Sequence, residues 1–339
     1  MGDKSHQVCV LDARGEQIRS ESIPNTKEGI GRFFRGYAGA LVAMEAGTHS
    51  GWVSRMVEGL GCRVVIGNPR KLRLIWKSGN KSDERDAFML AEIAQFKESM
   101  MHPIHHRGEA AQIALERIKA RDVLVRTRSS LINHVRGAVK GMGCRIARCS
   151  AEGFEARAEA EIPEGLRLAL LPLVRTIGEL TERIRGFDRA INELSTEEYP
   201  ETVRLRQVKG VGPVTALAYV LTLEDPGRFK KSRAVGAFLG LTQKRDQSGE
   251  TDKQLGITKA GNDHLRRLLV GSAHYILGPF GPDCELRRYG MRIAARGGKN
   301  AKRRAVVAVA RKLAVLLHRL WVSGEKYEPL RCVKSKQVA

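Results

Sequence analysis

Residues 40–67 read ALVAMEAGTHSGWVSRMVEGLGCRVVIG, in which two short apolar runs flank a segment with helical spacing. The runs Ala40–Glu45 and Arg63–Gly67 predict two buried strands, and His49–Leu60 predicts a helix between them. Strands that alternate with helices are typical of an α/β sheet domain. This segment therefore predicts the architecture of the N-terminal part of the chain.

The same alternation extends outward from this segment on both sides. Gln7–Asp12 and Gln17–Ile23 predict the two strands of a hairpin, because a turn containing glycine separates them. Thr26–Tyr37 and Ser82–Phe96 have the spacing of helices. Thr26 or Asn25 is placed to cap the first, and Ser82 or Asp83 could cap the second. We therefore expect one α/β domain over residues 1–105.

A long helical segment is predicted over residues 106–200. Its second half carries apolar residues at alternating spacings of four and three, which is the heptad seam of a coiled coil. So narrow a seam favours self-association of the protein, with packing inside the chain as the alternative. Pro172 lies within the seam and predicts that the helix begins there or is kinked. The seam consists of Leu166, Leu170, Leu173, Ile177, Leu180, Ile184, Phe187, Ile191 and Leu194.

Residues 201–325 predict a further helical domain, and residues 326–339 predict a loose tail. A polar, glycine-rich loop over Gly240–Gly261 interrupts the helices of this domain. Ala301–Trp321 has the pattern of a basic amphipathic helix. The fold class expected for the whole chain is thus α/β followed by all-α.

The charge of the chain points to its partners. Lys and Arg number 59 against 37 Asp and Glu, a formal net charge of +22 over 339 residues, which predicts a nucleic acid or an anionic membrane as partner. No apolar run reaches the roughly 20 residues that span a bilayer, and no N-terminal signal is evident. The six cysteines form no Cys-x-x-Cys pair, so we expect reduced thiols and no structural zinc. We expect a cytoplasmic, nucleoid-associated protein that binds nucleic acid and no membrane.

Three acidic residues are candidates for a metal site. Glu45 ends a buried strand, and the carboxyl ends of strands face the crevice in which α/β sheets place their sites. Asp83 and Asp86 are three residues apart, which puts them on one face of a helix. Three carboxylates at one crevice would supply the oxygen ligands that Mg²⁺ prefers and would serve phosphodiester cleavage. The alternative is that Asp83, or the serine before it, caps the helix and that Asp86 interacts with the helix dipole.

The segment Val208–Leu217 (VKGVGPVTAL) resembles the hairpin of a helix-hairpin-helix module. Two glycines bracket a valine, and the proline that follows favours the first position of a helix. Backbone N–H groups at such a helix start bind phosphate without reading sequence, which makes Lys209, Gly210 and Gly212 candidate nucleic-acid contacts. An ordinary glycine-rich turn between helices is the alternative.

Ser248 lies at the polar centre of the loop, which reads GLTQKRDQSGETDKQLGITKAG. An exposed serine there could attack a phosphodiester if a base or a metal activated it, whereas composition alone favours an ordinary turn. Arg266 and Arg267 follow on a helix, where they could clamp phosphate oxygens and stabilise a transition state.

Two groups of basic residues predict a surface for a polyanion, with ordinary solvated faces as the alternative. One group precedes the acidic helix, and the other lies near the C-terminus, where Arg303 and Arg304 are the candidate nucleic-acid contacts. The groups are Arg70, Lys71, Arg73, Lys77 and Lys81, and then Arg296, Lys299, Lys302, Arg303, Arg304, Arg311 and Lys312.

The order of these motifs resembles one known family. It resembles the order of motifs in transposases of the IS110 insertion-sequence family, particularly its IS1111 branch. The motifs are, in order, the strand glutamate, the helix of Lys81–Ala87 (KSDERDA), the heptad seam, VKGVGP and the string GLT…QSG…ITKAGN…LRRLL. The resemblance covers about residues 5–325, and residues 240–269 are its most specific part.

The resemblance implies a RuvC-like, RNase H-type N-terminal domain that carries Asp-Glu-Asp-Asp acids, and a C-terminal transposase domain with a catalytic serine. By position, Glu45, Asp83 and Asp86 correspond to the glutamate and the paired aspartates, and Ser248 to the serine. The resemblance also implies Mg²⁺ at the acids and a covalent serine–DNA link during strand exchange. It further implies a bridge RNA that pairs with target and donor DNA, and a dimer or tetramer held partly by the coiled coil.

The chain departs from the family's pattern at the first acid. That aspartate and its strand would fall before Met1, just ahead of a glycine that matches Gly2, and Asp3 is no clean substitute. Either the start codon lies further upstream or this copy lacks the strand. In the second case the metal site is one ligand short and the sheet exposes an edge.

The sequence thus predicts a DNA recombinase that moves its own element. A metal-dependent junction resolvase, in which Ser248 is only a turn residue, is the first alternative. A non-catalytic nucleic-acid-binding protein is the second.

Overall fold

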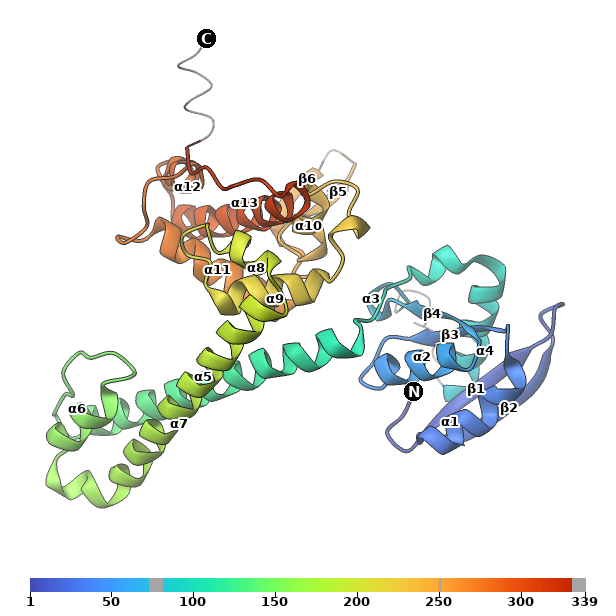
Figure 1. Ribbon diagram of the computed structural model, residues 1–339, viewed down its shortest axis with the longest axis horizontal. Helices are drawn as coiled ribbons and strands as arrows, with labels where there is room; N and C mark the ends of the chain where they lie inside the picture. The colour runs from blue at the N-terminus through green and yellow to red at the C-terminus, as the bar shows by residue number, and fades with distance from the viewer. Residues whose placement is uncertain (73–81, 250, 331–339) are drawn as a thin grey trace, which may run out of the picture. The chain divides into compact units, whose positions relative to one another are not determined.

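The computed structural model describes residues 1–72, 82–249 and 251–330, which belong to two compact units, Met1–Gly108 and Glu109–Ala339 (Figure 1). The basic residues Arg73, Lys77 and Lys81 and the end of the predicted tail lie outside the described residues. No helix among the described residues combines the length and the apolar character needed to cross a membrane.

The N-terminal unit contains the hairpin and the strand–helix–strand segment that the sequence predicts. β1 (Ser5–Leu11) pairs antiparallel with β2 (Gln17–Pro24), and β3 (Leu41–Glu45) pairs parallel with β4 (Arg63–Gly67). Thr26 caps the first helix, because its hydroxyl oxygen accepts a hydrogen bond from the backbone N–H three residues on. The helices of this unit are α1 (Lys27–Phe34), continued by a 3-10 turn (Arg35–Tyr37), α2 (Ser50–Gly59), α3 (Pro69–Leu72) and α4 (Asp83–Lys97), followed by a 3-10 turn (Glu98–Met101).

The four strands form two separate two-stranded sheets rather than one sheet. Val8 of β1 and Val42 of β3 both pack against the apolar core that includes α1 and α2. On the opposite face, Leu41 and Ala43 of β3 pack with Leu90 of α4, and α4 also contacts β1. The layer of α1 and α2 therefore covers one face of both sheets, and α4 covers the opposite face of β1 and β3.

A helical arm opens the second unit. Arg121 on its first long helix pairs with Asp188 on its last, whereas Arg128, further along the first helix, donates to Thr181, which is earlier on the last. The two long helices therefore run antiparallel within one chain. The arm consists of α5 (Glu109–Gly141), α6 (Phe154–Glu161) and α7 (Glu164–Glu197).

The whole predicted heptad seam lies on α7, and six of its nine residues are buried. Residues such as Ile177 and Ile191 are fully buried, and α7 contacts α5, α6 and α9. The seam therefore packs inside its own chain, as the alternative interpretation expects. These contacts do not support self-association through the seam, which stays a prediction. Pro172 lies within α7, so the prediction that the helix begins at this proline is wrong.

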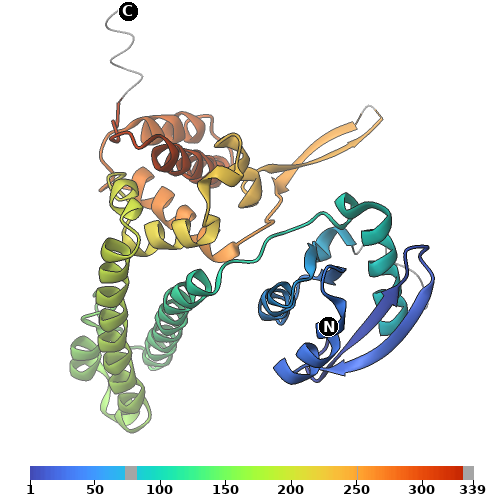
Figure 2. The ribbon, with the colours of Figure 1, turned by 45° about the vertical axis from the view of Figure 1, so that its right-hand side comes forward.

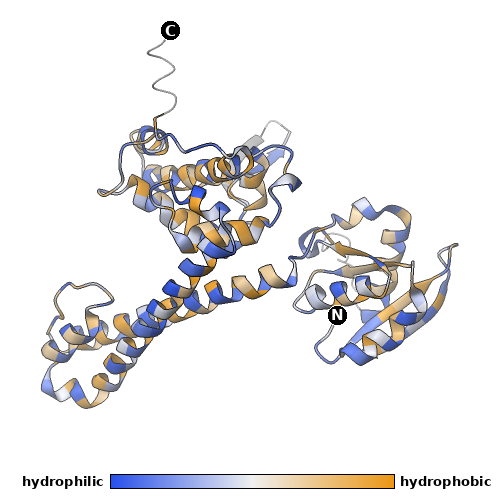
Figure 3. Ribbon diagram, viewed as in Figure 1, coloured by the Kyte–Doolittle hydropathy of each residue, from blue (hydrophilic) through white to orange (hydrophobic). Residues whose placement is uncertain are grey.

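The rest of the second unit is a helical body around an apolar helix and an amphipathic one. The inner helix α9 is buried from Thr215 to Leu223 and consists mostly of apolar residues (Figure 3). Its Tyr219 hydroxyl donates to the carbonyl of Ala314 on α13 at 2.6 Å. The predicted basic amphipathic helix is confirmed as α13. The helices of the body are α8 (Glu201–Leu205), α9 (Pro213–Leu223), a 3-10 turn (Pro226–Arg228), α10 (Arg233–Phe238), α11 (Asp263–Leu277), α12 (Glu285–Ala294) and α13 (Ala301–Ser323).

The segment predicted as a polar loop forms an antiparallel hairpin, β5 (Gln243–Ser248) and β6 (Thr251–Ile257), so the loop prediction is wrong for these residues. Ser248 pairs with Thr251, and Gly249, which follows Ser248, has a φ of +55°, which glycine adopts without strain. Figure 2 shows the hairpin extending away from the helices of its unit.

Candidate active site and nucleic-acid interface

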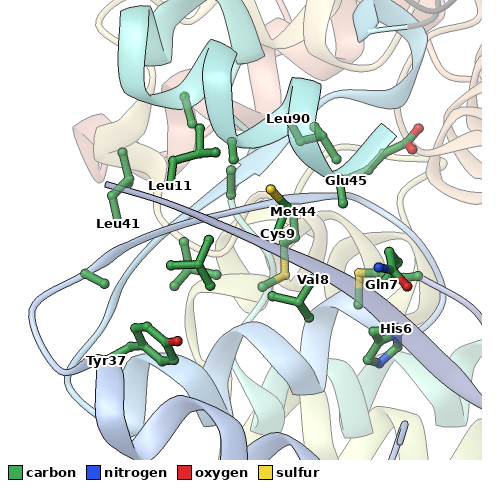
Figure 4. Close-up of a pocket in the computed structure, with 18 of the residues that line it drawn as sticks. His6, Gln7, Val8, Cys9, Leu11, Tyr37, Leu41, Met44, Glu45 and Leu90 are labelled. Atoms are coloured by element: carbon green, nitrogen blue, oxygen red, sulfur yellow. The ribbon is translucent and has the colours of Figure 1, made fainter. Parts of the chain in front are cut away.

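The three predicted acids line one cavity of the N-terminal unit, which has a volume of about 910 Å³. Figure 4 shows Glu45 at this cavity. Glu45 is the last residue of β3 and is exposed. Asp83 is the first residue of α4 and is also exposed, whereas Asp86, one turn further on, is half-buried. The fold therefore brings a strand end and a helix start, distant in the sequence, to the same cavity.

The cap of α4 leaves both aspartates available for other contacts. The Ser82 hydroxyl oxygen accepts a hydrogen bond from the N–H of Arg85 at 3.2 Å, so the serine and not Asp83 is the capping residue. The cavity's carboxylate oxygens have the donor chemistry that Mg²⁺ prefers. No three His, Cys, Asp or Glu side chains within the described residues are placed so that they could hold a metal ion.

Ser50 and His106 hold the loop that follows Glu45, and the sequence pattern singled out neither of them. The Ser50 hydroxyl donates to the Gly47 carbonyl at 2.8 Å, and its oxygen accepts from the Gly47 N–H at 2.9 Å. His106 Nε2 lies 2.7 Å from the same oxygen, where it acts as the donor. Burial, reinforced by two neighbouring arginines, lowers the pKa of His106, so its ring is neutral near pH 7.

Ser248, the candidate nucleophile, is the last residue of β5 and stands beside the hairpin turn. All six residues of β5 are exposed, so the serine is accessible to a partner as bulky as a nucleic acid. Ser248 belongs to the second unit and the three acids to the first.

Arg266 and Arg267 are neighbours on α11 but have different surroundings. The Arg266 guanidinium donates to the carbonyls of Leu239 at 3.0 Å and Ala260 at 2.8 Å, so it ties the base of the β5–β6 hairpin to the end of α10. Arg267 is exposed and lies 3.4 Å from Asp122 on α5. Arg266 therefore has a structural role in its own unit, and Arg267 is the more accessible of the two to a phosphate.

The turn between α8 and α9 contains the other predicted phosphate contacts. Lys209 and Gly212 are exposed. Gly210 has a φ of +95°, and an added Cβ would lie 2.9 Å from the ring of Tyr275 and 3.2 Å from the carbonyl of Ser272. Close packing against α11 therefore accounts for this glycine, while a phosphate contact at the turn stays a prediction.

Gly210→Ala is expected to lower the free energy of unfolding by about 1–3 kcal/mol, because alanine is strained at this φ and its Cβ meets α11. Gly212→Ala is the matched control: its φ is −90°, and nothing lies within 4 Å of the added Cβ. Urea unfolding of the two variants measures the difference. Equal losses in both would contradict the packing role of Gly210.

Exposed basic side chains gather on α12 and α13. The first turn of α13 carries exposed Lys302, Arg303 and Arg304 and no acidic residue. The backbone N–H groups at a helix start add to this positive charge. Such a surface suits phosphate groups. Further exposed residues nearby in the sequence are Arg292, Arg296 and Lys299.

Comparisons with known proteins place the chain among transposases. A family model described as Transposase IS116/IS110/IS902 family matches residues 203–282, and a DEDD-type IS110 transposase model matches residues 1–143. The chain is 28% identical over 337 residues to the transposase for insertion sequence element IS1111A of Coxiella burnetii, a match that covers 96% of this chain and 88% of the relative. It is 31% identical over 237 residues to the transposase for insertion sequence element IS1328 of Yersinia enterocolitica, with 69% of this chain and 70% of the relative covered. A putative transposase of Sinorhizobium fredii, y4pF/y4sB, is 30% identical over 306 residues, with 87% and 76% covered. The chain therefore belongs to the IS116/IS110/IS902 family of transposases.

Proposed function

We propose that this protein is an RNA-guided DNA recombinase that cleaves and exchanges DNA strands to move its insertion element. The observation that carries the proposal is the cavity shared by Glu45, Asp83 and Asp86, in a chain that belongs to a transposase family. The N-terminal unit would be the RuvC-like, RNase H-type domain, and the helical body would carry the serine.

The acidic cavity would position the reacting phosphate. Glu45, Asp83 and Asp86 line this cavity but do not lie close enough together to hold an ion, so they would have to converge to bind Mg²⁺, which would neutralise and polarise the phosphate oxygens. The hydrogen bonds between Ser50, His106 and Gly47 fix the loop after Glu45, so they would keep this carboxylate in place without touching the DNA.

Ser248 would be the nucleophile. Its Oγ releases its proton and forms a bond to phosphorus as the bond from phosphorus to one sugar oxygen breaks, and that oxygen takes up a proton and leaves as a hydroxyl, so that one proton is lost and one is gained. A sugar hydroxyl of another strand then attacks the phosphoserine, which breaks the Oγ–phosphorus bond and joins the strands without hydrolysis. Because the serine and the acids belong to different units, both units must reach the same DNA, within one subunit or across a dimer or tetramer.

Nucleic acid would bind through its phosphates at the basic start of α13 and at the turn that contains Lys209 and Gly212. Arg267 would be a further phosphate contact beside the hairpin. These surfaces read no base sequence, so pairing with the bridge RNA would choose the target.

Replacing Lys302, Arg303 and Arg304 by alanine is expected to weaken binding to duplex DNA and to RNA at low salt. The logarithm of the association constant decreases as the logarithm of the salt concentration rises. The magnitude of that slope should become smaller by up to about 2–3, since each lost phosphate contact removes roughly 0.7–0.9. Fluorescence anisotropy over a salt series measures both quantities. A control with alanine at the exposed arginines Arg175 and Arg183 of α7 should keep the wild-type slope. Equal slopes in all three proteins would remove α13 from the interface.

A further inference from the structure

Exposed aromatic side chains gather in one part of the second unit. Among the described residues, three Phe, Tyr or Trp side chains are exposed, and two of them, Tyr275 and Phe280, are five positions apart. Tyr275 is 44% exposed near the end of α11, and Phe280 is 83% exposed in the loop that follows. A single exposed aromatic residue is common, whereas two at one place indicate an interaction surface.

The loop after α11 holds Phe280 in a fixed position. The Arg287 guanidinium donates hydrogen bonds to two carbonyls at the end of α11, at 2.7 and 2.6 Å. Pro279 and Pro282 stand on either side of Phe280 and restrict the backbone further. Because the backbone around it is held, the exposed ring loses little conformational freedom when a partner packs on it.

The turn between α8 and α9 adds positive charge beside Tyr275. A ring carbon of Tyr275 lies 2.9 Å from the position of a Cβ added at Gly210, so the exposed Lys209 is next to this ring in the structure. Figure 1 shows α11 beside α9, with which it is in contact. Asp283, in the loop after α11, is paired with Arg288 at 2.6 Å, so its negative charge is balanced.

One exposed face of α11 continues this surface. Arg267, Gly271 and Tyr275 follow each other at intervals of four residues, which places them on one face over about 12 Å of helix. Arg267 keeps half of its side chain exposed beside Asp122 and Asp263.

Gly271 lies in the middle of this face and is exposed. In the described part of the chain, only its chain neighbours and the backbone of its own helix lie within 4 Å of a Cβ added there. Packing therefore does not explain a glycine that weakens the helix. A bare stretch of helix backbone does allow a strand of another molecule to approach closely.

These features fit an unpaired nucleic-acid strand better than a duplex. Phosphates interact with basic side chains, and the flat faces of unpaired bases stack on aromatic rings. In a duplex the bases stack on each other and present only their edges in the grooves, so the rings have no base face to contact.

We propose that Lys209, Arg267, Gly271, Tyr275 and Phe280 form a track that binds an unpaired DNA strand. The bases stack on the two aromatic rings, the phosphates contact Lys209 and Arg267, and the strand passes over Gly271. Every base has a flat face, so the track is insensitive to sequence. The inference rests on the proposed function only in that DNA strands separate during exchange.

The first test measures binding of the full chain to a labelled single strand of DNA and to the matching duplex, by fluorescence anisotropy in EDTA. Tyr275→Ala and Phe280→Ala should each weaken single-strand binding at least about fivefold and leave duplex binding within about twofold. Tyr275→Phe and Phe280→Tyr keep a ring and should bind as the wild type does. Leu168→Ala, at a 93% exposed position of α7, is the control for the loss of an exposed apolar side chain.

Gly271→Gln separates binding from a structural role. Glutamine favours a helix more than glycine does and meets open space, so the melting temperature should be unchanged or higher. Single-strand affinity should nevertheless fall at least about threefold, because the new side chain occupies the track.

Photocrosslinking locates the strand directly. A single strand that contains 5-iodouracil is bound to the full chain and irradiated, and the crosslinked peptides are identified by mass spectrometry. The expected peptides contain Tyr275 or Phe280.

Four results would overturn the inference. Wild-type single-strand affinity in both alanine variants would remove the rings from the interface, and an equal loss for the duplex would leave only a general basic surface. A larger loss for RNA of the same sequence than for DNA would assign the track to RNA. Altered sedimentation of the alanine variants would assign the rings to a contact with a second copy of the chain. None of these measurements requires DNA cleavage, so the track and the proposed reaction fail separately.

Discussion

Ser248→Ala is expected to abolish strand exchange, with recombination at least about 10³-fold below wild type, because the oxygen that forms the covalent link is lost. The serine lies on an exposed strand, so its removal costs no packing. The measurement is the yield of joined product from element-end DNA and target DNA with bridge RNA and Mg²⁺.

Gln247→Ala is the matched control for this change. Gln247 is the neighbour of Ser248 on the same exposed strand. Its replacement should leave recombination within about threefold of wild type, as for surface residues that touch no reacting group. Equal losses in the two variants would assign the effect to the hairpin rather than to the hydroxyl. Full activity in Ser248→Ala would favour a resolvase that uses only the acids.

Asp86→Asn is expected to produce the second large effect. The change keeps the size of the side chain but removes a carboxylate from the acidic cavity. DNA cleavage should fall at least about 100-fold at saturating Mg²⁺, because a carboxylate that holds the metal and positions the phosphate is lost. A titration of cleavage rate against Mg²⁺ concentration separates weaker metal binding from a lower limiting rate.

Glu84→Gln provides the control on the same helix. Glu84 shares the first turn of α4 with Asp86 but is not among the residues that line the cavity. Both changes remove a favourable interaction with the helix dipole, worth about 0.3–1 kcal/mol, so both cost similar stability. Wild-type cleavage by Asp86→Asn, or equal losses in both variants, would contradict the proposed metal site.

Local patterns in the sequence were sufficient for the elements that surround the acids. Apolar runs predicted β3 and β4, and the hydroxyl residues Thr26 and Ser82 marked the starts of α1 and α4 because capping depends on residues three positions apart. The carboxyl end of β3 and the first turn of α4 were therefore predictable. Their meeting at one cavity depends on how the strands and helices pack.

The features that the sequence did not predict depend on contacts between distant residues. β5 is exposed along its whole length, so it lacks the apolar alternation that identifies a strand, and only the glycine of its turn gives a signal. The heptad seam of α7 packs in its own chain because α5 runs antiparallel beside it, which spacing alone does not reveal. Ser50 and His106 are 56 positions apart, and Arg266 binds carbonyls that only the fold brings to it.

Mapping a covalent protein–DNA link tests the central claim most directly. The full chain is incubated with element-end DNA, bridge RNA and Mg²⁺, denatured, digested with protease and nuclease, and examined by mass spectrometry. The expected result is a nucleotide attached to the peptide that contains Ser248, absent without the divalent ion and absent in Ser248→Ala. Cleaved DNA without any link to the protein would contradict the serine mechanism and leave a metal-dependent resolvase. Binding with neither a link nor cleavage would contradict catalysis altogether.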